Sequence, residues 1–274
     1  MKDHLKLMFK GGLIGIANII PGVSGGTMAV VLGIYEPLIE AIGEIVTNRE
    51  RRMEYLKFLA KVGAGAVLAI LIFSWIMDYL LTHYPNYTYL FFIGLIAGSI
   101  PSIYRSHTDM RLTLVSGVSF FLGMCIIVGF SLYSAEHQSG NVTGAVFQLS
   151  TGAVILLLIA GVLSGGSMIV PGISGSFMLV LLGQYEVVIR AVKHLEFLPL
   201  AILGTGILAG IWSFARMIEI LLKTYPRETF YFILGLVVAS LYAIFPGFPI
   251  GWVDWAISLA VVALGGWLSL RLSD

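Results

Sequence analysis

Charged side chains are scarce in this sequence, because only 11% of its 274 residues are Asp, Glu, Lys or Arg. An ordinary soluble domain carries about 25%. Apolar residues make up 58% of the chain and the mean hydropathy is +0.95. These values exclude an ordinary soluble domain and indicate an integral membrane protein. The net charge of +1 also lacks the strong basic surface that nucleic-acid binding requires, so we expect no nucleic-acid partner.

Cysteine and histidine are also rare. The single cysteine, Cys125, excludes an intramolecular disulfide and a cysteine-based metal cluster, and the five histidines lie at or near the ends of apolar segments. A membrane enzyme such as a lipid phosphatase would need a nucleophile or a base with partners. The apolar segments hold no histidine in their interior and no cluster of acidic residues at their interruptions. We therefore expect no catalytic residue, no metal site and no cofactor.

Two stretches of the chain match each other at a constant spacing of 150 residues. Residues 21–36 read PGVSGGTMAVVLGIYE and residues 171–186 read PGISGSFMLVLLGQYE, with ten of sixteen positions identical. Downstream, LLTHYP at 80–85 resembles LLKTYP at 221–226, at a spacing of 141. Such self-similarity is typical of an internal repeat, so we expect two related halves, 1–140 and 141–274, within one membrane domain.

Apolar runs indicate how each half crosses the bilayer, since a transmembrane helix needs about 20 residues. Six runs come close to this length or exceed it: 58–81, 89–104, 112–133, 201–222, 230–245 and 252–270. The two motif regions, about 5–46 and 149–192, have Pro-Gly near their middle and enough length for two arms each. The predicted fold is all-α, each half being a re-entrant helical hairpin followed by three transmembrane helices.

The positive charges favour hairpins over single crossings of the motif regions. With hairpins, one side of the membrane carries twelve Lys and Arg residues and the other only Arg190 and Lys193. The twelve are Lys2, Lys6, Lys10, Arg49, Arg51, Arg52, Lys57, Arg105, Arg111, Lys223, Arg227 and Arg271. The positive-inside rule then places both termini in the cytoplasm. Because each half crosses three times, the second half would be inverted relative to the first, as in secondary transporters.

The interruption in each motif region is a candidate anion site. Pro21 suits the first turn of a helix, Ser24 can cap exposed amides, and glycine lets another group approach the backbone. Irregular backbone at membrane depth persists only where protein or a wet cavity surrounds it. Helices that begin there present free N–H groups and a partial positive charge, so two of them would converge on one central anion site. The alternative is that these small residues serve only kinking and close packing.

Arg216 is a charged residue inside a predicted span, with Glu219 three positions on. It is a candidate cationic partner for a substrate anion, since intramembrane charge is often functional. Alternatively it pairs with Glu219 or extends towards the membrane surface. Asn18, beside the first interruption, either binds substrate or satisfies freed backbone groups. Both questions stay open at this point.

The motif residues resemble a known family. NIIPGVSGGT at 18–27 and PGISGSF at 171–177 resemble the paired signatures of the polyprenyl-phosphate transporters called PopT, of bacteria and archaea, over essentially the whole chain. The resemblance implies a multi-pass protein of the cytoplasmic membrane that moves undecaprenyl phosphate, the lipid carrier of cell-wall sugars, between leaflets for re-use. It implies that the phosphate head is held by Pro21, Gly22, Ser24, Gly25, Pro171, Gly172, Ser174 and Gly175. Gly26 and Thr27 belong to the first motif, where the second has Ser176 and Phe177.

We therefore expect a flippase that works by alternating access, with the lipid and the bilayer as its partners. Candidate substrate-binding residues are Asn18, Pro21, Gly22, Ser24, Gly25, Gly26, Thr27, Pro171, Gly172, Ser174, Gly175, Ser176 and Arg216. A secondary transporter or channel for a small soluble anion is the alternative, since the same helix ends would suit a carboxylate. A coupling ion, H⁺ or Na⁺, and the oligomeric state stay open.

Overall fold

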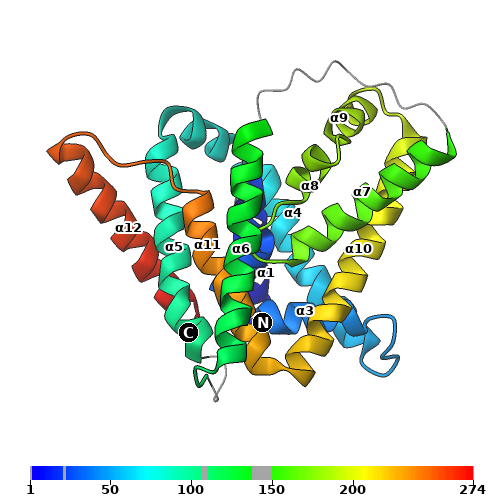
Figure 1. Cartoon of the computed structure of the whole chain (residues 1–274), viewed down its shortest axis with the longest axis horizontal. Coiled ribbons are helices and arrows are strands. Elements are labelled where there is room, and N and C mark those ends of the chain that lie inside the picture. Colours follow the sequence, from blue (N-terminus) through cyan, green and yellow to red (C-terminus); the bar gives the residue numbers. More distant parts are fainter. Residues whose placement is uncertain (1, 21–22, 106–109, 138–149, 274) are drawn as a thin grey trace.

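The computed structural model of the chain describes residues 2–20, 23–105, 110–137 and 150–273, and within these residues it contains helices and no strands. The prediction of an all-α fold is confirmed for this part of the chain (Figure 1). The helices are α1 (Lys2–Ile19), α2 (Gly25–Val31), α3 (Tyr35–Glu44), α4 (Arg52–His83), α5 (Pro85–Arg105), α6 (Leu114–His137), α7 (Thr151–Ile169), α8 (Gly175–Leu181), α9 (Tyr185–Lys193), α10 (Phe197–Thr224), α11 (Pro226–Ala243) and α12 (Trp252–Ser273).

Six of the described helices are long and apolar enough to cross a membrane: α4, α5, α6, α7, α10 and α12. Five of them coincide with runs that the sequence predicted as spans. The sixth predicted run, 230–245, forms α11, which is not among the six because its first turn carries polar residues, including Glu228. The sixth helix that is long and apolar enough to cross a membrane is α7, whose 19 residues fall within the region predicted as the second hairpin.

The same close packing recurs in two pairs of helices. α1 lies along α4, and α7 lies along α10. In the first pair Gly15 meets the backbone of Ala66, and in the second Gly165 meets the backbone of Ile207, so closely that neither glycine has room for a Cβ. Small residues let membrane helices approach in this way. Gly165 follows Gly15 by 150 residues and Ile207 follows Ala66 by 141, which are the two spacings found in the sequence.

The remaining long helices pair across the two halves. α5 lies along α12, and α6 along α11. Figure 1 shows both ends of the chain and α3 towards one end of the molecule, and α9 towards the other. The axes of α8 and α9 are bent by 114° relative to each other at the junction of the two helices. The two motif regions therefore turn towards opposite ends of the molecule.

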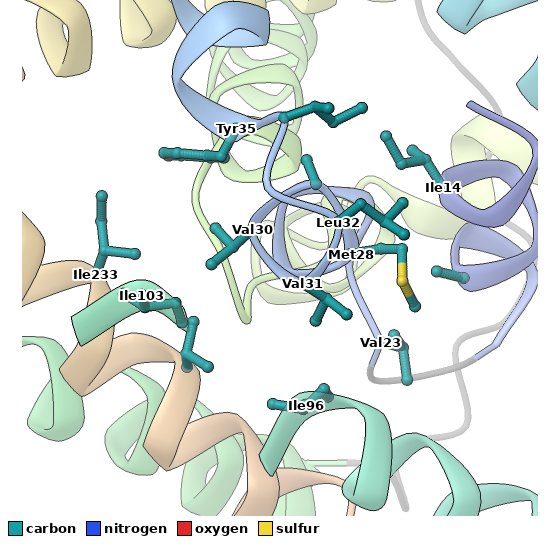
Figure 2. Close-up of a cluster of buried hydrophobic side chains, with 14 of the residues drawn as sticks. Ile14, Val23, Met28, Val30, Val31, Leu32, Tyr35, Ile96, Ile103 and Ile233 are labelled. Atoms are coloured by element: carbon teal, nitrogen blue, oxygen red, sulfur yellow. The ribbon is translucent and has the colours of Figure 1, made fainter. Parts of the chain in front are cut away.

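The largest apolar core surrounds α2 (Figure 2). Val31 and Leu32 are completely buried, among side chains that include Ile14 of α1, Ile96 of α5 and Ile233 of α11. All seven residues of α2 are buried. The described residues of the first interruption, Ile20, Val23 and Ser24, are buried as well, so they lie inside the protein, as irregular backbone in hydrocarbon requires.

Candidate functional site

The two interruptions contact each other directly, although they are far apart in the sequence. The backbone N–H of Gly172 donates to Ser24 Oγ at 3.1 Å and to Thr27 Oγ1 at 2.7 Å. The Tyr35 hydroxyl donates to the carbonyl of Ile169 at 3.2 Å, immediately before the second interruption. The structure thus brings together residues of both motifs at one point inside the molecule.

The first interruption is closed. Ser24 and Thr27 are 4% and 1% exposed, and Gly25 and Gly26 are also buried. Ser24 caps α2 by accepting the N–H of Thr27 at 3.1 Å. The N–H of Gly25 donates to Asn18 Oδ1 at 3.0 Å. The exposed side chain of Asn18 thus binds a backbone N–H group at the start of α2. In this conformation the hydroxyls of Ser24 and Thr27 are hydrogen-bonded to each other and to the N–H of Gly172. Pro21 and Gly22 lie outside the described residues.

The second interruption is open. Ser174 and Ser176 face a cavity of about 840 Å³, with their Oγ atoms 2.8 Å apart. Ser174 makes no side-chain cap bond to α8, unlike Ser24 at α2. Gly172 lines the same cavity, whereas Pro171 and Gly175 are buried behind it.

The wall of this cavity is formed by parts of both halves. It includes Asn86 and Tyr89 of α5, Phe130 and Ser131 of α6, and the connection after α11 around Pro246. None of the described residues that line it is charged. An anion in this cavity would therefore meet hydroxyl, amide and aromatic groups.

Arg216 lies elsewhere, in a cluster of charges between α3 and α10. Its guanidinium donates to Glu219 at 2.6 Å and lies 3.9 Å from Glu44 of α3. Lys223 donates to both carboxylates, at 2.6 Å to Glu44 and 2.5 Å to Glu219. Glu219 is only 3% exposed, and these two cations compensate its charge. Arg216 lines neither the cavity at Ser174 nor the apolar cavity beside it.

Hydrogen bonds hold Glu44 in its ionised form. Lys223, then Tyr55 at 2.7 Å and Asn48 at 3.0 Å, donate to its carboxylate and keep its pKa well below the usual range. Glu44 is the last residue of α3, and Lys223 lies in the last turn of α10. A carboxylate shared between these two helices therefore attaches the first motif region to the second half.

Comparison with known proteins identifies the family to which this fold belongs. Residues 14–252, most of the chain, match the model of the family described as undecaprenyl phosphate translocase-like. The chain belongs to this family. A protein of Staphylococcus aureus (strain NCTC 8325 / PS 47) named polyprenyl-phosphate transporter is 36% identical over 272 residues, which cover 97% of this chain and 94% of that protein. A Vibrio cholerae protein (serotype O1, strain ATCC 39315 / El Tor Inaba N16961) with the same name is 32% identical over 260 residues, covering 89% and 78%. No solved structure gives a significant match.

The translocase-like family is one of transporters and not of enzymes. In this member, sequence reasoning found the residues of both interruptions but not the cluster around Glu44. The spacing of Arg216, Glu219 and Lys223 along one helix face was a visible signal. Glu44 was not predictable, because its contact with Lys223 spans 179 residues of sequence.

Proposed function

We propose that the protein moves a polyprenyl phosphate, such as undecaprenyl phosphate, across the membrane and binds its phosphate head at Ser174 and Ser176. The observation that carries the proposal is the cavity of about 840 Å³ in which these two hydroxyls lie side by side. The names of the relatives supply the class of substrate. A lipid phosphate needs only its head enclosed, because the tail stays in the bilayer.

Two adjacent hydroxyls suit a phosphate chemically. Phosphate oxygens accept hydrogen bonds, and bonds to a charged group contribute about 1.5–3 kcal/mol each. Ser174 and Ser176 are close enough for both to reach one phosphate group. The absence of a charged side chain among the described lining residues keeps the binding moderate, which suits a carrier that must also release its substrate.

We further propose that the two halves form an inverted repeat, each beginning with a re-entrant hairpin, formed by α1–α3 in the first half and by α7–α9 in the second. The matched contacts of Gly15 and Gly165 support a repeat, and the opposite positions of α3 and α9 in Figure 1 support inversion. Ser24 and Ser174 would then be reached from opposite sides of the membrane. In the present conformation the second interruption lines a cavity, whereas Ser24 and the other described residues of the first interruption are buried.

Alternating access would follow from opening one side while the other closes. The charge cluster of Glu44, Glu219 and Lys223 links α3 to α10, and in this proposal it acts as the closed gate at the α3 end. The positions that match Glu44, Arg216 and Lys223 in the other half are His194, Trp75 and Thr82, which cannot reproduce the cluster. If both termini are cytoplasmic, the cavity at Ser174 opens towards the outer side of the membrane in this conformation. Breaking the cluster would expose the buried Ser24 and Thr27 to the cytoplasm.

Binding of undecaprenyl phosphate to the purified protein tests the head site. Replacing both serines, Ser174→Ala with Ser176→Ala, should weaken binding at least tenfold. The loss of a hydrogen bond to the charged phosphate costs about 1.5–3 kcal/mol, and a tenfold change in affinity corresponds to about 1.4 kcal/mol. The control is Thr205→Ala with Ser213→Ala, which removes two hydroxyls of α10 that bond to their own helix, at 2.8 and 3.2 Å. It should leave affinity unchanged.

Two outcomes would contradict the proposal. Equal affinity of the double serine variant and the wild type would remove these hydroxyls from the site. Tight binding of a soluble anion such as inorganic phosphate or a carboxylate, with no preference for the lipid, would support the transporter of small anions instead.

A further inference from the structure

A second cavity lies beside the head cavity and is apolar. It has a volume of about 290 Å³ and lies between α6, α7, α10 and α11. The two cavities share Phe130 and Ile173 in their walls. Along the second interruption, Val170 and Pro171 face the apolar cavity, while Gly172 and Ser174 face the polar one. Phe130 and Ile173 thus lie between the two cavities, and a molecule with a polar head and an apolar tail would occupy both when its tail extends past these two side chains.

The hydroxyl groups on the apolar wall are all engaged with backbone carbonyls. Ser167 donates to Ser164 at 2.7 Å, Thr229 to Tyr225 at 2.7 Å and Tyr35 to Ile169 at 3.2 Å. These side chains consequently present carbon to the cavity. A polar ligand would find no free hydrogen-bonding group among them, so the cavity suits a hydrocarbon.

The rim of the apolar cavity faces the outside of the helix bundle. Leu163 of α7 is 37% exposed, and Met217 and Leu221 of α10 are similarly accessible. Both helices are long and apolar enough to span a membrane. The cavity thus opens sideways, where lipid would surround these helices, and a chain could pass from it into the bilayer.

We infer that this cavity binds the isoprenoid units next to the phosphate of the transported lipid. The inference rests on the proposed function, because it takes the phosphate at Ser174 as its starting point. An apolar cavity of about 150 Å³ admits the six carbons of benzene, so this one holds roughly ten carbons, or about two isoprene units. The head site alone recognises any phosphate, whereas this cavity selects a phosphate that carries a branched hydrocarbon.

Filling the cavity provides the test. Leu163→Trp places an indole at its rim and should weaken binding of undecaprenyl phosphate at least tenfold. The inhibition constant of inorganic phosphate, which needs only the head site, should stay within twofold. The matched control is Leu158→Trp, on the same helix and 39% exposed, but not lining the cavity. This control should change neither value.

Crosslinking gives a second measurement that needs no substitution. A polyprenyl phosphate with a photoreactive group on its first or second isoprene unit should label α7, α10 or α11 of the wild-type protein. Labelling confined to α4 or α12, or full affinity of a folded Leu163→Trp variant, would overturn the tail site while leaving the head site intact. Failure of the wild type to bind the lipid at all would overturn the proposed function, and the tail site with it.

Discussion

Gly172 joins the two interruptions because of a backbone conformation that glycine adopts readily. Its φ is +83°, and a Cβ would lie 3.0 Å from Ile127 Cδ1 and 3.2 Å from the carbonyl of Leu236. In this conformation its N–H reaches Ser24 and Thr27 of the other motif. L-residues with a side chain adopt such angles at a cost of about 1–2 kcal/mol. The Pro-Gly pair of the second motif therefore serves the contact between the halves.

Replacing this glycine should destabilise the protein measurably. Gly172→Ala is expected to lower the free energy of unfolding by about 1–2 kcal/mol, from the strained φ and the crowding by Ile127 and Leu236. Denaturant unfolding of the purified protein in detergent measures the change. The control is Gly204→Ala in α10, where a Cβ meets no atom within 4 Å and should be neutral or stabilising. Equal stability of Gly172→Ala and the wild type would contradict the role of this φ.

At the scale of elements, α2 and α8 show how one motif leads to two environments. Each helix has seven residues and begins directly after the serine of its motif. α2 is buried, and Lys10 of α1 donates to the carbonyl of Leu32 at its carboxyl end, at 2.6 Å. The matching position in the second half is Ala160, which cannot donate such a bond. The neighbouring helices, and not the motif, decide which interruption is open.

The contact of α3 with α10 has a pH dependence that follows from Glu44. Because its folded-state pKa is below the ordinary value of 4.5, its ionised form stabilises the fold fully above that pH. The contribution is lost as the pH falls from there through the lowered pKa. Glu44→Gln should therefore reduce stability by about 1 kcal/mol at pH 7, a modest value because Lys223 is 58% exposed.

Unfolding in detergent at pH 7, 5 and 3.5 measures this dependence. The difference in the free energy of unfolding between the wild type and Glu44→Gln should be about 1 kcal/mol at pH 7, slightly smaller at pH 5 and clearly smaller at pH 3.5. The exposed Glu50 of the α3–α4 connection supplies the control, since Glu50→Gln should change stability little at any of these values. A difference that grows as the pH falls would exclude the assigned role of Glu44.

At the scale of the whole molecule, the proposed orientation in the membrane follows from the distribution of Lys and Arg residues and from the position of the cavity at Ser174. Figure 1 shows both ends of the chain at the α3 end of the molecule, and the start of α1 and the last turn of α12 carry Lys2, Lys6 and Arg271. The cavity at Ser174 is lined instead by the start of α5 around Asn86 and by the connection after α11 around Pro246. If the positive end is cytoplasmic, the open cavity faces the outer leaflet.

Thiol labelling in intact cells tests this orientation. After replacing the single cysteine by Cys125→Ala, one cysteine is introduced at an exposed position of each end, Glu50→Cys or Phe248→Cys. A membrane-impermeant reagent should label only the Phe248→Cys protein in intact cells and both proteins after permeabilisation. Labelling of Glu50→Cys in intact cells would reverse the proposed orientation.

The sequence by itself determined that the protein lies in a membrane, that its fold is all-α and where its two motifs stand. Its apolar composition requires a membrane, because so few charged residues cannot cover a soluble surface. Its two matched stretches located Ser24 and Ser174 without any structure. The run at 230–245 was predicted as a span but forms α11, which is not among the six described helices apolar enough to cross a membrane, because its first turn carries polar residues such as Glu228.

Only the tertiary structure decided the surroundings of the two motifs. Ser24 and Ser174 occupy equivalent positions, yet one is buried in a network with Gly172 and the other lines a cavity. The pairing of Glu44 with Lys223 and the apolar cavity beside Ile173 likewise depend on helices distant in sequence. The physical reason is that burial and contact arise from packing between helices, whereas composition and periodicity describe each helix alone.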